Sequence, residues 1–125
     1  MRIFHIATAA DWAQAQASGH YTTSTLGLSL QEVGYIHAAR EEQWRAVKRR
    51  YYAEVYVPLL LLEIDTDLLD SPVVEERPGP GTEETFPHIY GPLNTAAVVG
   101  TRSITRSKLP PSTDRPTPSR RRPLP

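Results

Sequence analysis

The sequence predicts a small α+β domain, because its helical segments come early and most of its strand segments come late. Apolar, β-favouring residues open the chain and an alanine-rich segment follows them directly. After a second amphipathic helix, the chain continues as strands separated by proline and glycine turns. A doubly wound α/β fold would instead alternate strands and helices throughout. A chain of 125 residues fits one such domain, which we place at residues 1–105.

The first strand and the first helix are predicted by their boundary residues. Residues 2–7 combine apolar and β-favouring side chains and predict a strand. Thr8 is a favoured N-cap, and Asp11 stands at the acidic position of a capping box. Residues 9–18 have strong helix propensity, and Gly19 is suited to end the helix.

The middle of the chain predicts a short turn and the longer of the two main helices. Residues 20–28 are rich in Ser and Thr and predict a loop or irregular strand. Residues 29–32 carry a second capping-box pattern, and residues 35–38 predict a short strand. Residues 40–52 predict a helix whose apolar face recurs at helical spacing, formed by Trp44, Val47 and Tyr51.

The second half predicts strands and loops. The apolar run at 57–64 is typical of a buried central strand. Segments 73–76 and 96–104 predict further strands, and the Pro-Gly-Pro-Gly sequence makes residues 77–85 a loop. Residues 86–93 are bracketed by two prolines, so we expect a compact irregular segment there.

The neutral net charge hides an asymmetry between the two parts of the chain. Residues 106–125 hold six Lys or Arg side chains against one Asp, a net charge of +5, which leaves −5 on residues 1–105. An acidic body is a poor platform for nucleic acid, although the basic segment could contact it weakly. Proline and arginine dominate residues 106–125, which predicts a disordered tail.

The composition also bears on compartment and redox chemistry. The chain has no cysteine, which excludes disulfides, thiolate metal sites and a cysteine nucleophile. Its N-terminus lacks the apolar run of a signal peptide, and its longest apolar run is too short to cross a bilayer. We therefore expect a cytoplasmic protein without membrane contact.

Three histidines in apolar surroundings are the first candidates for a functional site. They are His5, His37 and His88, and burying them has a desolvation cost that convergence on one pocket would explain. Each could instead be structural, with one backbone hydrogen bond. Histidine is a metal ligand, but spacings of 32 and 51 residues match no compact metal motif, so no metal is expected.

Acidic and aromatic residues supply the remaining candidates. Glu75 and Glu76 are adjacent at the end of a predicted strand, so one of them at most can face a given cleft. An exposed acidic pair is the alternative. Three tyrosines could stack on a planar ligand or fill the core: Tyr21, Tyr35 and Tyr90.

Four ordered motifs resemble a known bacterial family. They are FHIAT at 4–8, SLQEVGYIHAA at 29–39, LLLLEID at 59–65 and FPHIYGPL at 86–93. Together they are similar to the family of unknown function DUF952, over residues 2–104. That family has been grouped with the ADP-ribosyltransferase superfamily, whose fold is a small split β-sheet that binds NAD. The resemblance thus implies an ADP-ribosyltransferase-like sheet here, with two main helices.

The resemblance also implies roles for individual residues. His5 would contact the nicotinamide ribose of NAD, with Tyr35 and His37 near the nicotinamide. Glu76 would bind the ribose and stabilise the positive charge that develops as nicotinamide leaves. His88 and Tyr90 would line the same cleft. Family members often carry Ser where this chain has Ala39.

Three functions follow as hypotheses. The first is transfer or hydrolysis of ADP-ribose with NAD as the substrate, in which His5, His37 and Glu76 are catalytic. In that case the tyrosines and His88 would bind the nucleotide. The second is a non-catalytic domain that binds a nucleotide or another small ligand. The third is a protein-interaction module that uses the Pro/Arg-rich tail.

Overall fold

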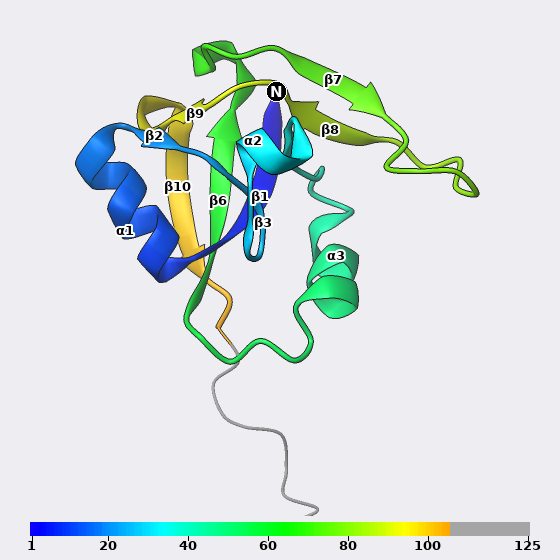
Figure 1. Cartoon of the computed structure of the whole chain (residues 1–125), viewed down its shortest axis with the longest axis horizontal. Coiled ribbons are helices and arrows are strands. Elements are labelled where there is room, and N and C mark those ends of the chain that lie inside the picture. The colour runs from blue at the N-terminus through cyan, green and yellow to red at the C-terminus, as the bar shows by residue number, and fades with distance from the viewer. Residues whose placement is uncertain (106–125) are drawn as a thin grey trace, which may run out of the picture.

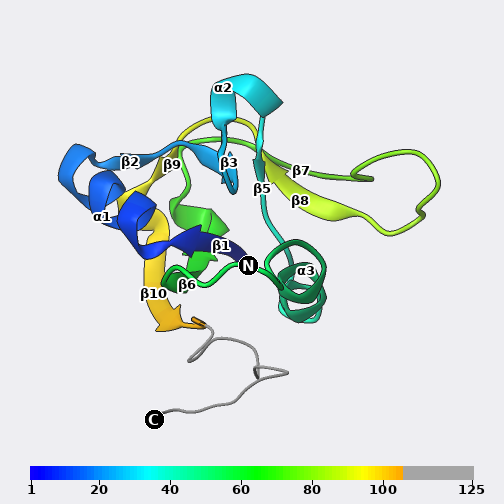
Figure 2. The same ribbon diagram turned by 60° about the horizontal axis from the view of Figure 1, so that its bottom comes forward.

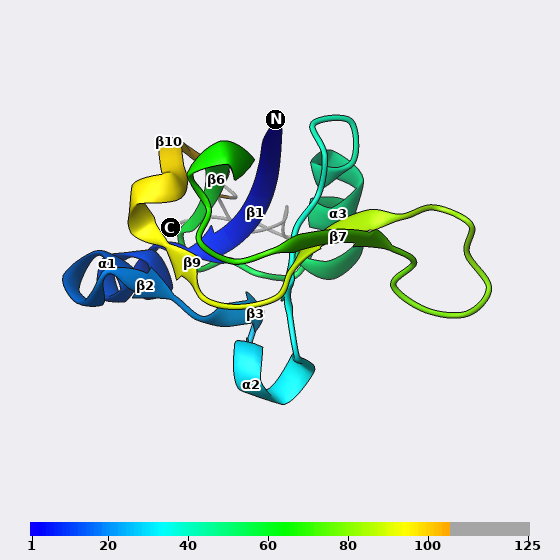
Figure 3. The same cartoon turned by 90° about the horizontal axis from the view of Figure 1, so that it is seen from above.

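The central element is a three-stranded antiparallel sheet with a helix on each face. The structure is a computed structural model and describes residues 1–105. Strand β6 (Leu59–Asp65) lies between β1 (Arg2–Thr8) and β10 (Val98–Ser103). Helix α1 (Ala9–Ser18) covers one face and α3 (Trp44–Tyr51) covers the other (Figures 1 and 3).

Alternation along β1 divides the apolar core into two clusters. Ile3 and Ala7 pack with Trp12 of α1 on one face of the sheet. Phe4 and Ile6 point to the opposite face, where they pack with α3. Strand β6 contributes leucines to both clusters, so it must be apolar on both sides. This explains the continuous apolar run that marked it in the sequence.

A second antiparallel sheet extends from the body of the molecule. Strand β8 (Phe86–Ile89) lies between β5 (Ile36–His37) and β7 (Val73–Glu76). Strands β7 and β8 form a hairpin whose loop, residues 77–85, projects beyond α3 (Figure 2). The sheet therefore places the segment around β5 between the hairpin and the central sheet.

The segment that follows β5 joins the two sheets through its main chain. The Ala38 amide donates to the Pro87 carbonyl of β8 at 3.0 Å. One residue later, Ala39 exchanges two hydrogen bonds with Phe4 of β1, at 2.7 and 2.8 Å. The chain thus changes partner from one sheet to the other within two residues.

The remaining elements are short. Strands β2 (His20–Tyr21) and β9 (Leu93–Asn94) pair with each other, as do β3 (Thr23–Thr25) and β4 (Leu28–Ser29). The helical turns are α2 (Leu30–Val33) and the two 3-10 turns η1 (Thr66–Leu68) and η2 (Thr95–Ala97).

Local sequence signals are confirmed at both predicted caps. Thr8 accepts a hydrogen bond from the Asp11 amide at the start of α1, which ends before Gly19. Ser29 and Glu32 form both bonds of a capping box, at 2.9 and 3.1 Å. The strand at 73–76 and the α+β class are likewise confirmed.

Two segment predictions were wrong in part. Residues 86–89 are regular, since β8 continues through Pro87, whose carbonyl still accepts from Ala38, and only residues 90–92 are irregular. The helix predicted over 40–52 spans Trp44–Tyr51 and follows a turn at 41–43, in which the Arg40 amide donates to Gln43 Oε1 at 2.9 Å. The loop or irregular strand predicted at 20–28 is confirmed as short strands, with a register shift between β3 and β4.

Two further sequence predictions concern the whole chain. Within residues 1–105, no helix is long and apolar enough to cross a membrane. The tail predicted at 106–125 lies outside the described residues, and the division of the chain at residue 105 stays a prediction.

We expect Gly91→Ala to destabilise the protein by about 3 kcal/mol. Gly91 follows β8 with φ of 151°, and a Cβ there would overlap Ser71 Oγ and lie 3.0 Å from Ser71 Cβ. Gly27 is a matched control, because it has φ of 75° and a Cβ added there would meet nothing within 4 Å beyond its chain neighbours. Gly27→Ala should cost about 1 kcal/mol. Urea denaturation measures both, and equal losses would contradict the steric argument.

Candidate functional site

One face of the second sheet gathers polar and aromatic side chains. Residues two apart on a strand point to the same face, and His37 of β5 is paired with His88 of β8. The neighbours on this face follow from the same alternation, and ring contacts confirm three of them: Tyr35, Phe86 and Tyr90. Tyr35 stacks on His88 with ring centres 3.9 Å apart.

A chain of hydrogen bonds runs across this face from the exposed edge of the sheet. Glu76 on β7 contacts His88 Nδ1 at 2.9 Å. His88 Nε2 in turn lies 3.2 Å from His37 Nδ1. Tyr90 also donates its hydroxyl to Glu76. Four side chains, three from strands β5, β7 and β8 and one from Tyr90 just after β8, are therefore linked in series, and His37 lies at the inner end.

The ionised state of Glu76 fixes the direction of the first of these hydrogen bonds, the one from His88. Hydrogen bonds from Tyr90 and His88 lower the pKa of Glu76, and the same bond to Glu76 raises the pKa of Tyr90 to about 12. A carboxylate accepts only, so His88 donates from Nδ1. With both rings neutral, His88 Nε2 accepts from His37 Nδ1–H. His37 Nε2 then carries a lone pair.

His37 is a neutral base at physiological pH. Burial and then the neighbouring His88 lower the pKa of His37 to about 4. Among the described residues, no hydrogen-bond partner is found for its Nε2 atom. This atom is therefore available to accept a hydrogen bond from a ligand or to take up a proton.

His5 has a different role. It is 3% exposed, and burial lowers its pKa to about 4. Its Nδ1 donates to the His37 carbonyl at 2.6 Å, and its Nε2 accepts from the Tyr21 hydroxyl at 3.0 Å. Burial also raises the pKa of Tyr21. Both ring nitrogens are used within the protein, so His5 supports the backbone of β5.

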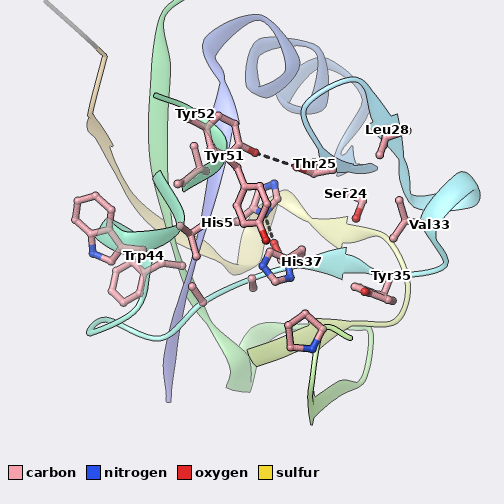
Figure 4. A pocket seen from close by; sticks show the side chains of 16 residues that line it. His5, Ser24, Thr25, Leu28, Val33, Tyr35, His37, Trp44, Tyr51 and Tyr52 are labelled. Carbon is pink, nitrogen blue, oxygen red and sulfur yellow. Dashed lines mark hydrogen bonds between the residues drawn. The ribbon is translucent and has the colours of Figure 1, made fainter. Parts of the chain in front are cut away.

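Beside His37 lies a largely apolar cavity of about 380 Å³, here termed the central cavity. Strands β1, β3 and β5 and helix α3 form its walls, as Figure 4 shows. None of the described residues that line it is Lys, Arg, Asp or Glu. Its aromatic wall consists of Phe4, Tyr35, Trp44, Tyr51 and Tyr52. The cavity therefore suits an uncharged, ring-shaped group.

A second cavity of about 540 Å³, the outer cavity, adjoins the first and is more polar. Both are lined by His37, Val47, Tyr51 and Pro78, so His37 lies where they meet. The outer cavity is also lined by Arg50 and by the Pro-Gly-Pro-Gly loop.

The loop beside the outer cavity is tied to the start of α3. Gln43 donates from Nε2 to Glu84 and to the Thr85 carbonyl, both at 2.9 Å. Arg40 binds Glu75 at 2.7 Å. These contacts hold the loop of the β7–β8 hairpin against the body of the protein.

A comparison with protein families shows the family of this chain. The sequence profile described as "Protein of unknown function (DUF952)" matches residues 6–101. The chain belongs to the DUF952 family. This DUF952 domain is similar to protein CC0527 of Caulobacter crescentus, whose crystal structure is 25% identical over 82% of this chain and 85% of that one, with a TM-score of 0.69.

A solution NMR structure of CC0527 is also similar, at 25% identity over 83% of this chain and 84% of that chain, with a TM-score of 0.63. No match is found among curated proteins. None of these descriptions names an ADP-ribosyltransferase, so the link of this DUF952 domain to that superfamily stays a prediction.

The structure places some of the predicted site residues in the lining of the central cavity and the others behind that lining or in the core. Of the predicted site residues, His5, Tyr35 and His37 line the central cavity. The others are not among its lining residues: Tyr21 lies in the core, and Glu76, His88 and Tyr90 lie behind His37 in the hydrogen-bonded chain. Glu75 and Glu76 bind different partners, Glu75 contacting Arg40. The assigned roles stay predictions.

Sequence reasoning missed several cavity residues. Ser24 and Thr25 of β3 line the central cavity, and so do Tyr51 and Tyr52 at the end of α3. Ser24 and Thr25 were missed because residues 20–28 were predicted only as loop or irregular strand. Tyr51 was assigned to the apolar face of a helix and not to a cavity. Among the described residues, no group of three or more His, Asp or Glu side chains is arranged to hold a metal ion.

We expect the free energy of unfolding to fall between pH 7 and pH 5. The folded-state pKa of His5 and of His37 is about 4, below the ordinary 6.5, so the unfolded chain binds more protons in this window. The stability from each neutral ring is complete above about pH 6.5 and is lost as the pH falls toward 4. The loss at pH 5 should be roughly 2 kcal/mol for buried His5 and less for half-buried His37.

Urea denaturation at the two pH values measures this loss. His20→Ala is the matched control, because His20 is exposed on β2, and it should keep the wild-type pH dependence. His37→Ala should reduce that dependence. A wild-type protein that is equally stable at both values would contradict the buried neutral state.

We expect Glu76→Gln to change the protonation of His37 without unfolding the protein. Gln can donate as well as accept, so His88 is no longer held with its proton on Nδ1. Nitrogen-15 NMR of the imidazole rings at pH 7 should show an unprotonated Nε2 for His37 in the wild type and a mixture of tautomers in the variant. Glu75→Gln is the control and should leave the His37 signals unchanged.

Proposed function

We propose that this DUF952 domain binds a small ligand whose uncharged planar ring enters the central cavity and donates a hydrogen bond to His37 Nε2. NAD and related nucleotides are the candidate ligands. The observation that carries the proposal is the position of His37. Its Nδ1 is held by His88 at 3.2 Å, and its ring lies where the two cavities meet.

The lining of the central cavity supports an uncharged ring as the inserted group. Aromatic side chains provide stacking surface. A charged group would lose its hydration without gaining an ionic partner, because no charged side chain of the described residues lines this cavity. A pocket of this size with few polar groups is typical of small-molecule sites. The adenine ring of a nucleotide, the reduced nicotinamide ring or free nicotinamide meets these requirements, whereas the oxidised nicotinamide ring of NAD is a cation and does not.

The outer cavity supports a ligand that carries phosphate next to the ring. Arg50 lines it, together with a glycine-containing loop. Arginine binds phosphate oxygens through its planar guanidinium group. A nucleotide whose ring occupies the central cavity would extend past His37 toward Arg50. This path is the basis for preferring nucleotides among ring-shaped ligands.

Ligand binding is better supported than ADP-ribose transfer by the mechanism that the resemblance to ADP-ribosyltransferases implies. That mechanism requires a carboxylate at the reacting ribose, whereas Glu76 binds His88 and Tyr90 and does not line either cavity described above. Glu84 lines the outer cavity but accepts from Gln43. If a reaction occurs, His37 Nε2 is free among the described residues to take up a proton, but a pKa of about 4 makes His37 a weak base at neutral pH.

A thermal-shift panel tests the proposal with NAD, NADP, ADP-ribose, nicotinamide and common nucleotides. A ligand present at 100 times its dissociation constant should stabilise the protein by about 2.7 kcal/mol. His37→Ala should weaken binding by about tenfold, the effect expected for one lost hydrogen bond. His20→Ala should bind as the wild type does.

Two results would overturn this proposal. One is a panel in which no ligand shifts the melting temperature of the wild type. The other is a ligand that binds the wild type and a folded His37→Ala variant equally well. Release of nicotinamide from NAD, measured on the same samples, separates an enzyme from a binding domain.

A further inference from the structure

The central cavity contains a hydroxyl that the fold does not use. Ser24 on β3 is 1% exposed, and no hydrogen-bond partner is found for its Oγ atom among the described residues. A buried hydroxyl without a partner is destabilising. Ser24 lines the central cavity, and Figure 4 shows its hydroxyl turned toward the part of the cavity where His37 and Tyr35 lie.

Several other polar groups around the cavity already have partners. Thr25 Oγ1 lies 3.3 Å from the Tyr52 hydroxyl, and both ring nitrogens of His5 have partners. Trp44 Nε1 is buried without a partner among the described residues, but Figure 4 shows it on the side of the ring away from His37.

The hydroxyls of Tyr35 and Tyr51 also belong to the cavity lining, but Tyr35 is only half-buried and Tyr51 is exposed, so water can satisfy them. The Ser24 hydroxyl and His37 Nε2 are therefore the two groups on the inner side that remain for a ligand.

These two groups have complementary hydrogen-bonding roles. When both rings are neutral, the Nδ1 proton of His37 is directed to His88, and His37 can only accept at Nε2. The hydroxyl of Ser24 can accept, but it also has a proton to donate. A ligand that takes the Ser24 proton and supplies a proton to His37 must therefore present an acceptor to Ser24 and a donor to His37. In a neutral planar molecule, an amide supplies both, since its C=O and N–H groups lie side by side in the plane.

We propose that the central cavity recognises an amide edge on a planar ring, with the amide carbonyl accepting from Ser24 Oγ–H and the amide N–H donating to His37 Nε2. The ligand class comprises ring carboxamides and ring lactams. This inference rests on the proposed function, because it specifies which chemical group enters the same cavity. A carboxylate is disfavoured, because it cannot donate to His37 and would be buried without a cation.

Four small probes separate the two hydrogen bonds. Benzamide and 2-pyridone carry the full amide edge, as a carboxamide and as a lactam. Acetophenone retains only the carbonyl, and aniline retains only the N–H donor. Dissociation constants are measured by NMR titration of the full chain at pH 7. An amide probe should bind on the order of tenfold tighter than acetophenone or aniline, because each lacks one bond to a buried group.

Two variants assign each bond to its residue. Ser24→Ala should weaken benzamide and acetophenone on the order of tenfold and leave aniline unchanged. His37→Ala should weaken benzamide and aniline and leave acetophenone unchanged. Ser103→Ala, an exposed serine on β10, is the control and should change none of the affinities. The melting temperature of free Ser24→Ala should equal or exceed that of the wild type, since the hydroxyl has no protein partner to lose.

The outcomes distinguish this inference from the proposed function. Recognition of an amide edge is contradicted if acetophenone or aniline binds as tightly as the amide probes, or if Ser24→Ala binds benzamide as the wild type does. Either result leaves the central cavity as a binding site for a planar ring. If none of the probes binds and no nucleotide of the panel shifts the melting temperature, the proposed function fails. Tighter binding of benzamide than of 2-pyridone would identify a carboxamide ligand, and the reverse order a lactam.

Discussion

The paired main-chain hydrogen bonds between Phe4 and Ala39 join the two main sheets of the molecule. They are two bonds, yet they connect the central sheet to the sheet that carries the hairpin. His5 strengthens this joint by donating to the His37 carbonyl at 2.6 Å. The bond is shielded from water and is made by a ring that is neutral, so it orients the backbone without a buried charge. The position of β5 beside the cavity follows from this joint.

Two buried histidines, His5 and His88, and the half-buried His37 require an explanation in terms of protonation. A charged imidazole in apolar surroundings would be costly, and the protein avoids that cost by keeping His5 and His37 neutral through burial. Neutral rings have one donor and one acceptor, so each must be oriented by its neighbours. Glu76 supplies the orientation on one side of β5, and the His37 carbonyl supplies it on the other.

The parts of this structure that depend on neighbouring residues were predictable, and the parts that depend on distant pairing were not. Thr8 and Ser29 cap helices as their sequence context indicated. The contact of His88 with His37 spans 51 residues and arises from strand register, which no local pattern encodes. Ser24 was overlooked for the same reason. Its segment becomes a strand only by pairing with β4, and contacts with β1 and β5 bury it.

Candidate site residues were recognisable by type but not by role. An isolated histidine in an apolar strand has the same sequence signature whether it supports the backbone, as His5 does, or faces a cavity, as His37 does. Glu76 was singled out as an acid at a strand end, and the structure places it two hydrogen bonds from the cavity, through His88. Distinguishing these roles requires the register of β5, β7 and β8.

Position 37 serves the fold through its backbone and the cavity through its side chain. The carbonyl that His5 binds would be present with any residue there, whereas the ring nitrogen at the cavity is specific to histidine. A substitution at this position can therefore alter chemical preference while the architecture persists. If His37 binds the proposed ligand, position 37 is a place where ligand choice can diverge within a lineage of such domains, because folding and recognition then depend on different atoms of the same residue.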